Sequence, residues 1–239
     1  MNFEYLIALI AFFAFFTACV FLMKYVRHCK LFNCICIGII YVSYVFVCLH
    51  AYKTDTDPNR WNFLNTLPCA NVSPFMFSIM PLLLILPKKI KQYVYLLISL
   101  LVVGMLFSTV FGCVGNALRN YKFHWQFMLD YLAHTVLALF GIFLIRTKQA
   151  KLTTKNCLIS ASIIYGVATV MLILNVIFDK AFFGLSLNGK HNIYTLVLVS
   201  NSYLSALIYY VGLGVVLMLG FVVCKFFNKE RFALPLKHN

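Results

Sequence analysis

Long apolar runs separated by short polar gaps dominate this chain of 239 residues. About 20 apolar residues are needed to cross the roughly 30 Å of hydrocarbon in a bilayer. The runs are continuous and do not alternate between apolar and polar positions, which excludes the strands of a membrane barrel. Because backbone groups find no water inside a bilayer, each run must pair its own N–H and C=O groups as a helix. We predict seven spans, which are Tyr5–Met23, Leu31–His50, Cys69–Leu86, Val94–Val114, Phe127–Ile145, Cys157–Phe178 and Leu204–Phe226.

The composition agrees with a chain that has lipid as its solvent. Hydrophobic residues make up 63% of the chain and charged residues 11%, whereas a soluble domain carries about 25% charged residues. No internal repeat and no separate soluble domain stands out, so we predict one all-α transmembrane domain over residues 1–239. The net charge of +14 lies between the apolar runs, which favours membrane lipids as partners and argues against nucleic acid. Protein partners are not indicated.

The basic residues also predict an orientation, because cytoplasmic loops carry an excess of Lys and Arg. The first, third and fifth gaps and the C-terminal end hold 14 of the 20 basic residues, with Glu230 as the single acid. The other side holds the remaining six basic residues and the other five acids. We therefore predict a multi-pass protein of the cell membrane with its N-terminus outside and its C-terminus in the cytoplasm.

Strongly polar residues inside membrane spans are costly and are therefore candidates for function. In the predicted orientation they gather in the outer halves of the spans and in one outer loop. This set consists of His50, Asn71, Ser73, Asp130, His134, Asn175, His191 and Asn192.

Asp130 and His134 are the first pair with chemical content. They are four residues apart, so they share one face of a helix. A carboxylate in that position can orient the imidazole and favour a general-base role. The same pattern also fits an Asp at the helix entrance and a His bound to a neighbouring backbone carbonyl, with no chemistry.

Cys69 is the second candidate. Ser73 and Pro74 predict an N-cap followed by Pro at the first helical position, so Cys69 would precede a helix N-terminus, where the dipole favours a thiolate. Cys69 is then a nucleophile with His134 as its base, or else one small hydrophobe among nine cysteines. The pair Cys34 and Cys36 lacks spaced partners for a metal site, and no motif indicates a cofactor, so we predict neither.

These residues resemble the YwaF-like bacterial integral membrane proteins, which are related to vertebrate transmembrane protein 164. The similarity runs from about Asn65 to Val223 and is carried by the segment 67–73 (LPCANVS), His134, Asn175 and the segment 192–196 (NIYTL). Aligned on Asn71 and Ser73, the cysteine of the family pattern falls on Ala70, one residue after Cys69. The resemblance implies a seven-span fold and acyl transfer between lipids through a Cys–His pair.

The sequence thus favours a lipid-modifying acyltransferase or acyl hydrolase with a site facing the outer leaflet. Cys69 is the expected nucleophile, His134 the base and Asp130 its orienting group, whereas the substrate would be positioned by Asn71, Ser73, Asn175 and Asn192. A transporter component is one alternative, although the chain lacks the inverted repeat and the mid-depth polar residues of many carriers. A membrane scaffold without chemistry is the other alternative.

Overall fold

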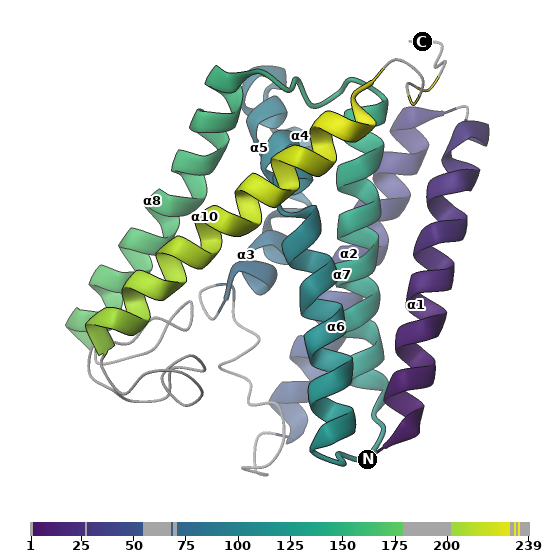
Figure 1. Ribbon diagram of the computed structural model, residues 1–239, viewed down its shortest axis with the longest axis vertical. Coiled ribbons are helices and arrows are strands. Elements are labelled where there is room, and N and C mark those ends of the chain that lie inside the picture. Colours follow the sequence, from purple (N-terminus) through teal and green to yellow (C-terminus); the bar gives the residue numbers. More distant parts are fainter. Residues whose placement is uncertain are drawn as a thin grey trace.

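The computed structural model describes residues 2–26, 28–54, 68, 71–178, 202–229, 232 and 234. Every regular element in these ranges is helical, which confirms the all-α prediction (Figure 1). The helices are α1 (Phe3–Leu22, continued by a 3-10 turn at Met23–Tyr25), α2 (Cys29–Thr54), α3 (Val72–Ile79), α4 (Leu82–Ile85), α5 (Lys88–Leu100), α6 (Val102–Leu118), α7 (Trp125–Arg146), α8 (Thr154–Phe178) and α10 (Ser202–Phe227).

Several of these helices are long and apolar enough to cross a membrane. Five stretches within the described residues qualify singly. Helices α5 and α6 qualify only as a pair, which is bent by 43° where the two helices meet, so the predicted span Val94–Val114 is not one continuous helix. The chain is therefore an integral membrane protein of the multi-pass kind. The five single stretches are Phe3–Tyr25, Cys29–Lys53, Trp125–Arg146, Thr154–Ile177 and Ala206–Phe227.

The predicted third span, Cys69–Leu86, does not form one continuous helix. Its described part is divided into α3, of 8 residues, and α4, of 4 residues. Pro81 separates them, because it has no N–H to donate to the preceding turn and its ring clashes with that turn. Figure 1 shows α3 at mid-height of the bundle, and not at the end where an outer span would begin.

Helix α7 forms the centre of the molecule (Figure 1). It packs against α2, α6, α5 and α1, and 83% of its central window is buried. A helix that is apolar on all sides can be covered by other helices or by lipid, and α7 is covered by other helices. In α1, by contrast, only 6% of the corresponding window is buried. The candidate residues of α7 are therefore enclosed by other helices.

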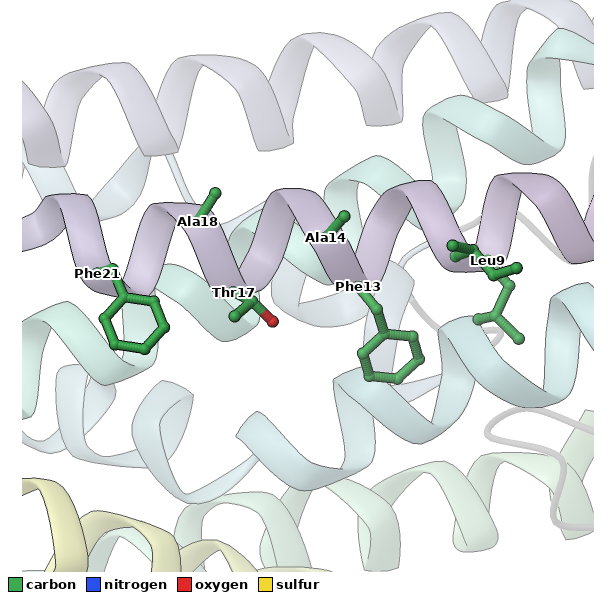
Figure 2. A pocket seen from close by; sticks show the side chains of 7 residues that line it. Leu9, Phe13, Ala14, Thr17, Ala18 and Phe21 are labelled. Atoms are coloured by element: carbon green, nitrogen blue, oxygen red, sulfur yellow. The ribbon is translucent and has the colours of Figure 1, made fainter.

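Helix α1 has an exposed face that no other helix in the described part of the chain covers. Figure 2 shows a shallow hollow on this face, with the Phe13 and Phe21 rings at its sides and Ala14, Thr17 and Ala18 between them. Its volume is about 670 Å³, and Leu9 and Ile10 complete its lining. Thr17 supplies the single polar side chain of the lining, so the hollow has no group suited to acid–base or nucleophilic chemistry.

Candidate functional site

Asp130 and His134 lie side by side on α7, as their spacing predicted. Both are buried, with 9% and 5% of their surfaces exposed, and the Asp130 Oδ2 atom is 3.6 Å from His134 Nδ1. His134 is nine residues from Trp125 and twelve from Arg146 at the two ends of α7. At about 1.5 Å per residue, the imidazole lies close to the middle of this helix.

The contacts of His134 assign roles to its two nitrogens. Its Nδ1 atom is 2.8 Å from the backbone carbonyl oxygen of Asp130. A carbonyl only accepts hydrogen bonds, so Nδ1 carries the proton in the neutral ring and Nε2 carries the free lone pair. Nε2 makes no hydrogen bond with any described residue. The carboxylate lies close to the ring, as the general-base interpretation requires, and the ring is bound to a backbone carbonyl, as the interpretation without chemistry requires.

Helix α3 brings a second element to His134. The Phe77 ring stands at 86° to the imidazole, with 4.9 Å between the ring centres. Ser73 lies one helical turn before Phe77 and so shares its face of α3. Ser73 is buried, and its hydroxyl donates to the Met105 sulfur of α6 across 3.8 Å. The start of α3 thus lies within about one turn of the residue that touches His134.

The N-cap of α3 differs from the prediction of Ser73 followed by Pro74. Asn71 is the N-cap, and its side-chain oxygen accepts from the Val72 N–H at 2.9 Å. Asn is as good an N-cap as Ser, and Pro is tolerated at the third position because the first four N–H groups of a helix have no partner within it. The Asn71 side chain is consequently engaged by its own helix.

The remaining predicted residues are Asn175, Cys69 and Asn192. Asn175 is buried near the end of α8, which packs along α5. No hydrogen bond or ion pair joins Asn175 to Asp130 or His134 within the described part of the chain. Cys69 and Asn192 lie outside the described residues, so their place relative to His134 stays a prediction.

One residue of this face was missed by the sequence analysis. Gln126 lies one turn before Asp130, is 4% exposed, and its Nε2 donor has no hydrogen-bond partner. Buried donors are nearly always bonded, so an orphaned amide next to the pair is a candidate for holding a substrate oxygen. The spacing of four that links Asp130 to His134 also links Gln126 to Asp130, and this signal was available in the sequence.

Within the described ranges no group of three or more His, Cys, Asp or Glu side chains is placed to hold a metal ion. No family model, no curated protein and no solved structure matches this chain. The fold and the site together describe an integral membrane protein with a buried Asp–His pair in its central helix.

Proposed function

We propose that the protein is a membrane-embedded enzyme that transfers or hydrolyses the acyl chains of lipids, with Cys69 as nucleophile and His134 as base. The observation that carries this proposal is the hydrogen bond from His134 Nδ1 to the Asp130 carbonyl. It directs the basic Nε2 atom away from the backbone of α7 and keeps it available for proton transfer. The reaction class itself comes from the resemblance to the YwaF-like proteins.

The proposed reaction has two balanced steps. The Cys69 thiol gives its proton to His134 Nε2 while the sulfur attacks the ester carbonyl, and the leaving lipid alkoxide takes that proton as the C–O bond breaks. The acyl group then passes from the thioester to the hydroxyl of a second lipid, or to water, which loses its proton to Nε2. The Cys69 thiolate leaves as the C–S bond breaks and takes that proton back from Nε2. The Asp130 carboxylate, 3.6 Å from Nδ1, would stabilise the imidazolium formed in each step.

The substrate-binding roles follow the same proposal. Gln126, one turn before Asp130, is a buried donor without a hydrogen-bond partner and is suited to the carbonyl oxygen of the ester. The hydroxyl of Ser73 already donates to Met105, and its role at the substrate rests on the resemblance. Asn71 caps the start of α3 and Asn175 lies near the end of α8, whereas Asn192 lies outside the described residues. We assign these residues to substrate positioning on the resemblance alone.

The proposed topology has seven segments with the N-terminus outside and the C-terminus in the cytoplasm of the cell membrane. In it, α3 and α4 form a partial third segment, and α5 with α6 forms the bent fourth. The basic helix ends that meet at one end of the bundle support this orientation. A C-terminal green fluorescent protein fusion should fluoresce and a C-terminal alkaline phosphatase fusion should be inactive; the opposite pattern would reverse the orientation.

Covalent labelling tests the chemistry. Purified protein in lipid is treated with a lipid-like acyl probe that reacts with thiols, and the wild type is compared with Cys69→Ala and His134→Ala. The matched control is Cys34→Ala, which removes an exposed cysteine of α2. We expect labelling to be lost in Cys69→Ala, to fall by about a hundredfold in rate in His134→Ala, and to persist in the control. Equal labelling in all variants would remove Cys69 from the site.

A transporter component is the second candidate, and one observation favours it. Helix α3 begins at mid-height of the bundle (Figure 1), and broken helices that start at mid-depth form substrate sites in many carriers. Solute flux into proteoliposomes that is lost in His134→Ala, together with absent acyl labelling, would support transport over acyl transfer.

A further inference from the structure

Glycines of two other helices pack closely against the end of α5, just before the break between α5 and α6. A Cβ atom at Gly220 of α10 would overlap the Leu100 carbonyl oxygen, and one at Gly141 of α7 would lie 3.0 Å from both the Ile98 oxygen and the Ser99 Cα. These neighbours are backbone atoms, which cannot move aside as a flexible side chain does. The last turn of α5 is therefore enclosed between α7 and α10.

Hydrogen bonds hold the same turn in place. The Ser99 hydroxyl donates to the Gly141 carbonyl at 2.9 Å, and the Cys224 thiol of α10 donates to the Ser99 carbonyl at 3.2 Å. A helix break inside a membrane persists only where neighbouring groups satisfy the backbone that the break sets free. Here α10 supplies the Cys224 thiol to the Ser99 carbonyl, and its Gly220 packs closely against the next carbonyl, that of Leu100.

The break leads directly to the candidate site. After a bend of 43°, α6 resumes, and the Met105 N–H bonds to the Leu101 carbonyl at 2.9 Å. Met105 is buried, and its sulfur accepts from Ser73 at the start of α3. A chain of direct contacts thus runs from Gly220 through the break to Met105 and Ser73.

We propose that Gly220 is a positioning residue whose contact with the Leu100 carbonyl fixes the α5–α6 bend and thereby holds Met105 against Ser73. The inference rests on the proposed function only in treating the start of α3 as part of a site. A side chain at position 220 would push α10 away from the break, change the bend and move Met105 from Ser73.

Hydrogen exchange of the full-length protein in lipid nanodiscs tests this without any need for catalysis. We compare Gly220→Ala with Gly212→Ala, whose added Cβ in the same helix would meet nothing within 4 Å. Gly220→Ala should raise exchange by roughly tenfold at residues 101–105 and also at residues 75–79, because overpacking favours local opening. Gly212→Ala should leave both segments unchanged. An increase confined to 101–105, or the same response in both variants, would overturn the proposal.

Milder variants keep the test decisive if Gly220→Ala does not fold. Cys224→Ala removes the thiol donor and should raise exchange in both segments, and Cys224→Ser should restore the wild-type pattern because its hydroxyl can donate to the same carbonyl. Met105→Leu should raise exchange at 75–79 alone, since it removes the sulfur acceptor beyond the break. Failure of Cys224→Ala to reach residues 75–79 would count against the proposal. Acyl labelling of the wild type is scored separately, so failure of the enzyme hypothesis leaves this result readable.

Discussion

Arg146 is a buried cation whose partners are backbone carbonyls. Its Nη1 atom donates to the Val20 carbonyl at 2.7 Å and its Nε atom to the Phe232 carbonyl at 3.0 Å, while its own carbonyl accepts from the Leu234 N–H. Val20 belongs to the last turn of α1, where unpaired carbonyls carry the negative end of the helix dipole. One side chain therefore joins the end of α7 to the end of α1 and to the C-terminal segment.

Replacing Arg146 by Gln should destabilise the fold. The shorter neutral side chain cannot span both carbonyls, and hydrogen bonds to charged groups are worth about 1.5–3 kcal/mol. Thermal unfolding in detergent micelles, followed by circular dichroism, measures the loss. Lys151→Gln, which neutralises an exposed cation at the same end, is the control and should change stability by less than about 0.5 kcal/mol. Equal unfolding midpoints for the two variants would show that the contacts of Arg146 with these carbonyls do not stabilise the fold.

Asp130 permits a sharper separation of chemistry from folding. Asp130→Asn keeps the size of the side chain and the backbone carbonyl that holds His134, but it removes the negative charge near the ring. We expect the rate of acyl transfer, or of probe labelling, to fall by roughly ten- to a hundredfold while the unfolding midpoint stays near that of the wild type. A variant with full activity would reduce Asp130 to a residue that orients the ring through its backbone alone.

At the scale of the helices, run length was the reliable predictor. It located α1, α2, α7, α8 and α10 within a few residues, because the thickness of the bilayer fixes how much apolar sequence a span needs. It failed over residues 72–85, where apolar length was counted although Pro81 interrupts the helix. It also failed over the predicted span Val94–Val114, which is divided between α5 and α6. Breaks of this kind follow from local backbone chemistry and not from hydropathy.

Some contacts of the candidate site were likewise predictable from the sequence, and others were not. The Asp130–His134 pair was predictable because helical spacing fixes which side chains meet. The contacts of Phe77 with His134 and of Ser73 with Met105 were not, because they depend on how α3, α6 and α7 pack. No local periodicity contains that information.

The approach of α7 to α5 gives a prediction at this scale. Gly141→Ala would place a methyl group against the Ile98 carbonyl and Ser99, and overpacking of this kind costs about 1–3 kcal/mol. Gly166→Ala in α8 meets nothing within 4 Å and should be neutral or slightly stabilising, because Ala is the better helix former. The measurement is the unfolding midpoint of each variant in the same detergent. A Gly141→Ala variant as stable as the wild type would contradict the close approach of α7 to α5.

For the whole molecule, the distribution of charge between the two ends of the bundle is the dominant property. The end where α1, α7 and α10 finish and α2, α5 and α8 begin (Figure 1) carries most of the described cations and none of the described acids. No lysine or arginine forms an ion pair with a carboxylate in the described ranges. The cations at this end are Lys24, Lys30, Lys88, Lys89, Lys91, Arg146, Lys148, Lys151, Lys155, Lys225 and Lys229.

Unpaired cations at the border of a bilayer should make the stability of this protein depend on lipid charge. Each lysine near an anionic surface contributes about 1 kcal/mol of attraction, and 0.5 M salt shortens the screening length to about 4–5 Å. We expect the unfolding midpoint to be higher in bilayers with 30% phosphatidylglycerol than in pure phosphatidylcholine, and the difference to shrink in 0.5 M salt. The triple replacement of Lys88, Lys89 and Lys91 by Gln should remove much of this difference.

The matched control lies at the other end of the bundle. Lys53 and Lys122 are exposed there, and replacing both by Gln should leave the difference between the two lipids nearly unchanged if anionic lipid is confined to the leaflet at the lysine-rich end. The protein must therefore be reconstituted in one orientation, with phosphatidylglycerol in that leaflet only. A loss of the lipid effect in the control and not in the triple variant would show that the two ends had been assigned the wrong way round. That outcome would contradict the grouping of the basic helix ends at one end of the bundle, which is the observation that supports the proposed orientation.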